Sequence, residues 1–151
     1  MTKFDVLNIG AVGTFVVRKS VRESMLRNAI AQKLPFKCEI IIIPGPDLLK
    51  LAATDPFSPY PLDPNITRFV NVLAKPIERP ANTPLAFPSE KDWLLRIIAI
   101  ENRFVLGIYK RDIKSVRYLG IIEKQFGVPA TNRNWNTIEK VVQILQRDPA
   151  V

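Results

Sequence analysis

Four side chains in the segment 131–137 (Thr-Asn-Arg-Asn-Trp-Asn-Thr) are of types that bind phosphate or carboxylate groups. They are Arg133, Asn134, Asn136 and Thr137. The apolar residues that follow recur with helical spacing, so the segment is predicted to open a helix. Backbone N–H groups at a helix start attract anions, and Arg133 would add a full positive charge beside them. One interpretation is therefore an anion- or ligand-binding site at this helix start.

The same segment has a structural interpretation. Thr131, Asn134 or Asn136 would cap the helix, and with Asn136 as the cap Glu139 would complete a capping box. Trp135 would then fill the core. Arg133 would pair with a carboxylate or with backbone carbonyl groups. The sequence alone leaves both interpretations open.

A second candidate is the basic stretch 110–117, which Tyr109 and Tyr118 flank. Its cations are Lys110, Arg111, Lys114 and Arg117. Cations interleaved with aromatic rings can follow a phosphate backbone while bases stack on the rings. The alternative is a solvated connection that leads into a helix.

The chain contains no histidine and one cysteine, Cys38. These counts exclude a Ser-His-Asp triad, a histidine zinc ligand, an intramolecular disulfide and a cysteine metal cluster. We expect no metal and no cofactor, and an enzyme is disfavoured. Cys38 is predicted to be buried at the start of an apolar strand. The glycines in 10–13 lack the third glycine and the lysine of phosphate-binding loops, so they predict a backbone bend.

The formal charge of +8 is concentrated towards the two ends of the chain. Residues 1–37 carry seven Lys/Arg against two acids, and residues 103–151 carry nine against four. If the ends meet, they would form one basic surface that attracts polyanions. The 151 residues suit a single domain, 1–151. No apolar run approaches the roughly 20 residues of a membrane span, so a cytoplasmic protein without a membrane partner is expected.

The elements that would position these residues follow from hydrophobic periodicity and turn signals. A strand is predicted at 14–17, then a helix behind the capping-box pattern 20–23. The apolar stripe of that helix is Val21, Met25, Leu26, Ala29, Ile30 and Leu34. The remaining predictions are a buried strand 38–43, a helix 48–53, a strand 67–75, a hairpin of 93–100 and 103–109, and helices 115–126 and 134–146. Proline-rich loops separate the middle elements.

The turn of that hairpin is centred on Glu101-Asn102, and Gly127 is expected to end the helix 115–126. The order of elements predicts an α+β fold with a mixed β-sheet. It would contain ferredoxin-like split βαβ elements, a β-hairpin and two C-terminal helices.

Three segments resemble the domain-of-unknown-function family 1697. Residues 133–137 match its R-N-W-N-T signature, 55–57 (D-P-F) resemble its N-P-F turn, and 9–16 stand where it has an S-G-N-V-V-F strand. The sequence begins after the family's usual L-R-G-I-N-V-G-G strand and helix, and Asn132 replaces a common threonine. The resemblance implies an α+β fold with ferredoxin-like parts and no established activity.

The leading hypothesis is a non-enzymatic binding or interaction domain whose basic surface takes nucleic acid or another polyanion. A rival is an enzyme or binder for a small phosphorylated or carboxylated compound, with Arg133 as the anion clamp. A third is a structural homodimer that pairs through an exposed strand edge or through the glycine-containing segment.

Overall fold

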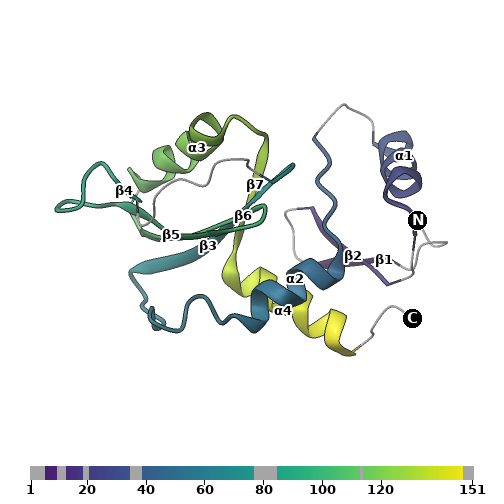
Figure 1. Cartoon of the computed structure of the whole chain (residues 1–151), viewed down its shortest axis with the longest axis horizontal. Coiled ribbons are helices and arrows are strands. Elements are labelled where there is room, and N and C mark those ends of the chain that lie inside the picture. Colours follow the sequence, from purple (N-terminus) through teal and green to yellow (C-terminus); the bar gives the residue numbers. More distant parts are fainter. Residues whose placement is uncertain are drawn as a thin grey trace. The chain divides into compact units, whose positions relative to one another are not determined.

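The computed structural model describes residues 6–9, 13–18, 21–34, 39–76, 85–112 and 114–147, with the side chain of Ile122 excepted. The chain divides into two compact units (Figure 1). One unit joins Met1–Ala52 to Asn136–Val151, and the other is Ala53–Trp135. The single domain expected from chain length stays a prediction.

The Ala53–Trp135 unit is built on a five-stranded sheet of order β4-β5-β6-β3-β7. Its strands are β3 (Ile66–Leu73), β4 (Leu85–Phe87), β5 (Leu95–Glu101), β6 (Phe104–Lys110) and β7 (Ala130–Asn134). Every neighbouring pair is antiparallel. The predicted mixed sheet is therefore wrong, although the α+β class is confirmed.

The predicted ferredoxin-like split βαβ unit is not formed either. It required strands at 14–17 and 38–43 around a helix, and residues 39–43 are in no strand. Residues 40–43 are half-buried isoleucines. A short apolar run has the same composition in a buried strand and in a buried connection, so its periodicity could not distinguish them.

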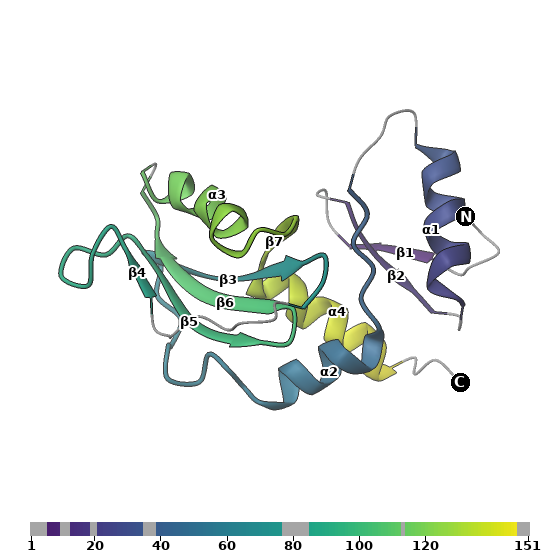
Figure 2. The ribbon, with the colours of Figure 1, turned by 45° about the horizontal axis from the view of Figure 1, so that its top comes forward.

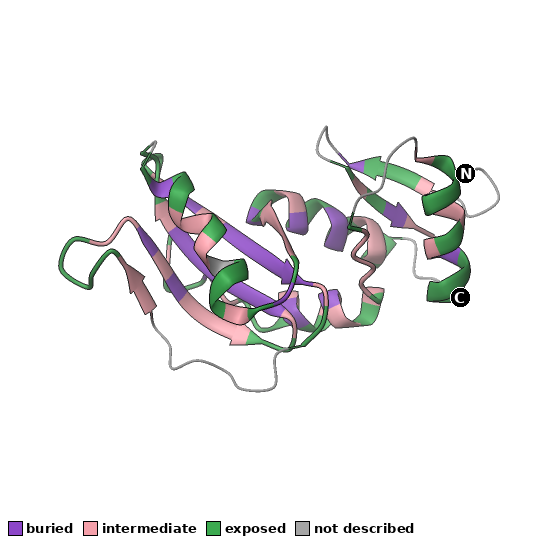
Figure 3. Cartoon of the chain, turned by 90° about the horizontal axis from the view of Figure 1, so that it is seen from above, coloured by how far each residue is buried: buried purple, intermediate pink, exposed green. Residues whose placement is uncertain are grey.

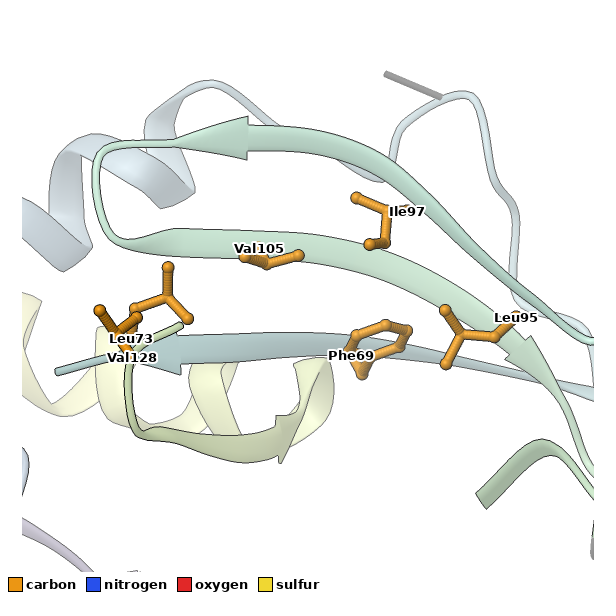
Figure 4. Close-up of a cluster of buried hydrophobic side chains, with 6 residues drawn as sticks. All are labelled: Phe69, Leu73, Leu95, Ile97, Val105 and Val128. Atoms are coloured by element: carbon orange, nitrogen blue, oxygen red, sulfur yellow. The ribbon is translucent and has the colours of Figure 1, made fainter. Parts of the chain in front are cut away.

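Helix α3 (Ser115–Phe126) covers one face of the five-stranded sheet (Figures 1 and 2). Side chains alternate between the two faces of a strand, and the register places Phe69, Gly107 and Ile97 in one row facing α3. Six buried side chains form the cluster under the helix (Figure 4). They are Phe69, Leu73, Leu95, Ile97, Val105 and Val128. The central strands β3 and β6 are the most continuously buried (Figure 3).

Local sequence signals predict this unit well. The β5–β6 turn falls at the expected place, and Asn102 has the positive φ (55°) that its amide side chain tolerates. Helix α3 has the predicted bounds and ends at Gly127, whose φ is 66°. Strands β4 and β7 were not predicted, because β4 lies in a proline-rich stretch and β7 directly precedes a helix.

The other unit contains a hairpin of the strands β1 (Val6–Ile9) and β2 (Thr14–Val17). It also contains the helices α1 (Glu23–Lys33), α2 (Gly45–Ala53) and α4 (Trp135–Arg147). The first residue of α4, Trp135, belongs to the sheet unit. The strand 14–17 and both later helices confirm the predictions. Gly13 has a φ of 77°, which confirms a bend there, whereas Gly10 and Cys38 lie outside the described residues.

Helix α1 differs from its prediction in two respects. It begins at Glu23, and its N-cap Arg22 makes no side-chain capping hydrogen bond, while Ser20 lies outside the described residues. Of the predicted stripe only Leu26 is buried, and Met25 is 51% exposed. Phe15 on β2 is also 55% exposed. None of the helices in the described ranges is both long and apolar enough to cross a membrane.

Candidate functional site

The segment 131–137 spans the junction of a strand and a helix. Its first half belongs to β7, where Arg133 pairs with Val70 of β3 in the antiparallel ladder. Helix α4 begins at Trp135, so Asn134 stands at the position before the helix. Asn136 is the second residue of α4, so it is not the cap, and the capping box with Glu139 is wrong. The four candidate ligand residues therefore divide between two elements.

Arg133 makes hydrogen bonds inside its own strand. Its Nη1 donates to Thr131 Oγ1 and to the Asn132 carbonyl oxygen, both at 2.7 Å. Burial lowers the pKa of the guanidinium, although arginine stays protonated in proteins. These contacts favour the structural interpretation of Arg133, with backbone carbonyls and a hydroxyl as partners. Its role as an anion clamp stays a prediction.

Trp135 is a core residue of the sheet unit. It is 6% exposed, and its ring centroid lies 5.0 Å from that of Phe57 in a tilted arrangement. The guanidinium carbon of Arg68 lies 5.8 Å from the centre of the same Phe57 ring. Phe57 belongs to the D-P-F stretch. The two stretches 55–57 and 133–137 therefore meet through their aromatic rings, as packing partners.

The basic stretch 110–117 does not form one surface. Lys110 lies on the sheet face opposite α3, because it follows Ile108 by two residues on β6. Arg111 donates from Nε to Thr67 Oγ1 at 3.2 Å, and Thr67 faces α3. Lys114 and Arg117 are exposed at the start of α3. The structure thus separates Lys110 from the other three cations.

Lys110 instead joins a cluster around Trp93, which we call the Trp93 cluster: Trp93, Arg96 and Lys110. The Lys110 Nζ and the Arg96 Cζ each lie 4.6 Å from the centroid of the Trp93 ring. Arg96 and Lys110 share a sheet face because Arg96 pairs with Ile108. Trp93 is half-buried and lies two residues before the first residue of β5. The cluster places two cations on one partly accessible aromatic ring.

Arg96 is not fully satisfied by the chain itself. Its Nη2 lies 3.8 Å from Glu90 Oε2, too far for a hydrogen bond, and Glu90 is 67% exposed. Its Nε is buried and has no hydrogen-bond partner among the described residues. Lys110 is exposed and forms no ion pair within the described part of the chain. The positive charge of the cluster is therefore only weakly compensated by Glu90.

The free energies of cation–π contacts and of base stacking indicate which ligands the Trp93 cluster can bind. A cation–π contact at an exposed site is worth about 0.5–1 kcal/mol. Stacking of a nucleic-acid base on an aromatic side chain is worth about 1–3 kcal/mol. A flat ligand can therefore replace the Lys110 ammonium on the ring. The released ammonium would then be available to an anionic group of the same ligand.

Sequence reasoning missed Trp93 and Arg96 as site residues. Their spacing to each other is visible in the sequence, but their contact with Lys110 depends on the register of β5 against β6. The described residues contain no group of three or more metal-ligating side chains that could hold a metal ion. The predicted cationic stretch identified Lys110 and assigned it the wrong neighbours.

Asp112 shapes the entry into α3 beside this cluster. Its Oδ1 accepts a hydrogen bond from the Lys114 backbone N–H at 2.9 Å, and its carbonyl oxygen accepts from the Ser115 N–H at 2.9 Å. Ser115 is fully buried. Because Lys114, the N-cap of α3, makes no side-chain capping bond, Asp112 supplies the side-chain acceptor at this end.

We expect Asp112→Ala to lower the free energy of unfolding by about 1 kcal/mol, the usual effect of losing a capping acceptor. Urea denaturation measures it. Asp112→Asn keeps an acceptor oxygen and should recover most of the loss. An unchanged denaturation midpoint in Asp112→Ala would show that the helix start does not depend on this bond.

The fold and site define an α+β protein with a cationic, aromatic cluster on an antiparallel sheet. No protein-family model, no curated protein and no solved structure matches the chain. The resemblance to the domain-of-unknown-function family 1697 therefore stays a prediction.

Proposed function

We propose that this chain is a non-enzymatic binding domain for a polyanion, with nucleic acid as its ligand, and that the Trp93 cluster is part of the contact surface. The observation that carries the proposal is the pair of 4.6 Å contacts that place Arg96 and Lys110 on one half-buried indole ring. Cations attract the phosphate backbone, while aromatic rings contact bases. We also propose a cytoplasmic location, which rests on the sequence.

The distribution of charge supports the same ligand class. Residues 103–135 hold seven Lys/Arg and two acids, and residues 136–151 hold two of each. The basic excess of 103–151 thus lies wholly in the Ala53–Trp135 unit. The N-terminal excess of residues 1–37 lies in the other unit, and a single basic surface formed by both ends stays a prediction. The unit that carries the Trp93 cluster is itself cationic, which favours association with polyanions.

The test is binding of a labelled oligonucleotide, measured by fluorescence anisotropy over a series of salt concentrations. We expect the affinity to fall as salt rises, because phosphate contacts release counterions. The double variant Arg96→Gln/Lys110→Gln should bind more weakly. It should also reduce the slope of log affinity against log salt by about 1 for each phosphate that the two side chains neutralise in the parent protein.

The matched control is Lys50→Gln/Lys140→Gln, which removes the same charge from exposed positions on α2 and α4. It should keep the slope of the parent protein. Equal losses of affinity in both double variants would show that net charge alone matters and that the Trp93 cluster is not the site. Absence of salt-dependent binding in the parent would refute the proposed function itself.

A further inference from the structure

We infer that the Trp93 cluster selects single-stranded over double-stranded nucleic acid, by stacking one base on the indole ring of Trp93. This inference rests on the proposed function and adds the strand state of the ligand. In a duplex the faces of the bases are covered by their neighbours. In a single strand a base face is free to contact an aromatic side chain.

The arrangement of the three side chains in the Trp93 cluster can hold a base and a neighbouring phosphate at the same time. Trp93 is half-buried, so its side chain is partly accessible to a ligand. Arg96 projects from β5 and Lys110 from the end of β6, on the same sheet face. Both cations lie within 4.6 Å of the ring centroid. A base on this ring would therefore hold its phosphates within reach of two cations.

The two cations differ in how they can respond to a ligand. Lys110 is exposed, so its long side chain can leave the ring and follow a phosphate. Arg96 is more enclosed, since its side chain is only 26% exposed. Its Nε has no acceptor within the described residues. Arginine planes also stack on bases, which lets Arg96 stay beside the indole when a base arrives.

A peptide rich in aspartate and glutamate offers the charge without the base. It would bind the cations and leave the indole ring unstacked. Inorganic polyphosphate behaves in the same way, and a duplex of equal length presents phosphates with covered base faces. These three ligands therefore separate charge attraction from base stacking at Trp93.

Fluorescence provides a direct measurement. The chain has two tryptophans, and Trp135 is buried, so Trp135→Phe leaves Trp93 as the only reporter. We expect oligo(dT) to quench Trp93 emission on binding. Inorganic polyphosphate, the acidic peptide and the duplex should bind without comparable quenching. On the Trp135-containing background, Trp93→Ala should weaken oligo(dT) binding by roughly 5- to 150-fold, as removal of one stacked base implies.

The outcomes distinguish the two proposals. If oligo(dT) and polyphosphate bind equally, and Trp93 emission is unchanged by both, the stacking inference is wrong and polyanion binding stands. Tighter binding of the duplex would also overturn the inference. If none of the ligands binds, the proposed function fails as well. Trp93→Phe, which keeps an aromatic ring, should retain most of the oligo(dT) affinity. This affinity measurement does not require the Trp135→Phe variant, so it can be made even if that variant is too unstable to use.

Discussion

Trp135→Ala is expected to lower the free energy of unfolding by about 3–5 kcal/mol, the cost of removing a large aromatic side chain from a core. Trp135 is 6% exposed, and its partner Phe57 is 3% exposed. The two rings lie 5.0 Å apart, so the substitution removes an aromatic contact as well as buried apolar area. Urea denaturation followed by circular dichroism measures the change.

The matched control is Trp93→Ala, which removes the same side chain from a half-buried position. It should cost much less stability, because part of the indole is already in water and its ring faces two cations. A comparable loss of stability in both variants would contradict the assignment of Trp135 to the core and Trp93 to a binding surface. Trp135→Phe should retain most of the stability.

This prediction also bears on how the segment 131–137 is understood. If Trp135→Ala kept the free energy of unfolding of the parent protein but lost its binding of ligand, the segment 131–137 would be a functional site. The observed contacts point the other way. Arg133 donates within β7, and Trp135 packs on Phe57. The contacts of Arg133 and Trp135 therefore favour the structural interpretation of the segment 131–137, and its role in anion binding stays a prediction.

Signals that act over a few residues predicted the sheet unit well. Gly127 ends α3 because glycine adopts the left-handed conformation without strain. Asn102 supports the β5–β6 turn for a related reason. In the other unit, the helical spacing of the apolar residues after the segment 131–137 predicted α4. In each case the cause lies within one turn of helix or one reverse turn.

The sequence-based predictions failed where the structure of a segment depends on residues that are distant in the sequence. Residues 130–134 carry two asparagines and an alanine, which are depleted in strands, yet they pair with β3 as strand β7. The isoleucines at 40–43 have strong strand composition and join no strand. Pairing with β3 makes 130–134 a strand although its local composition does not predict one.

The candidate site illustrates the same limit. The run 110–117 was identified by composition, but alternation along β6 places Lys110 on one face while Arg111 contacts Thr67 on the other. Trp93 and Arg96 became its neighbours through the β5–β6 register. The sequence therefore identified Lys110 as a candidate, while the fold brought the Trp93 ring beside it.

Gly107→Ala is expected to destabilise the sheet unit by about 1–3 kcal/mol, the usual cost of overpacking a core. Gly107 lies on β6 between Phe69 and Ile97. A Cβ atom there would stand 2.5 Å from Phe69 Cζ and 2.6 Å from the Arg96 carbonyl oxygen. The Phe69 ring is fully buried, and the carbonyl belongs to the backbone of β5, so the ring and that strand must both shift.

Because that carbonyl belongs to Arg96, the substitution also tests whether the sheet positions the Trp93 cluster. A shift of β5 changes the separation of Arg96 from Lys110, so Gly107→Ala should weaken oligonucleotide binding although no charge is altered. The control is Gly120→Ala on α3, where an added Cβ meets nothing within 4 Å. Since alanine is the better helix former, that variant should gain up to about 1 kcal/mol and bind normally. If Gly107→Ala has the same urea denaturation midpoint and the same oligonucleotide affinity as the parent protein, the close approach of β5 and β6 does not hold the Trp93 cluster in place.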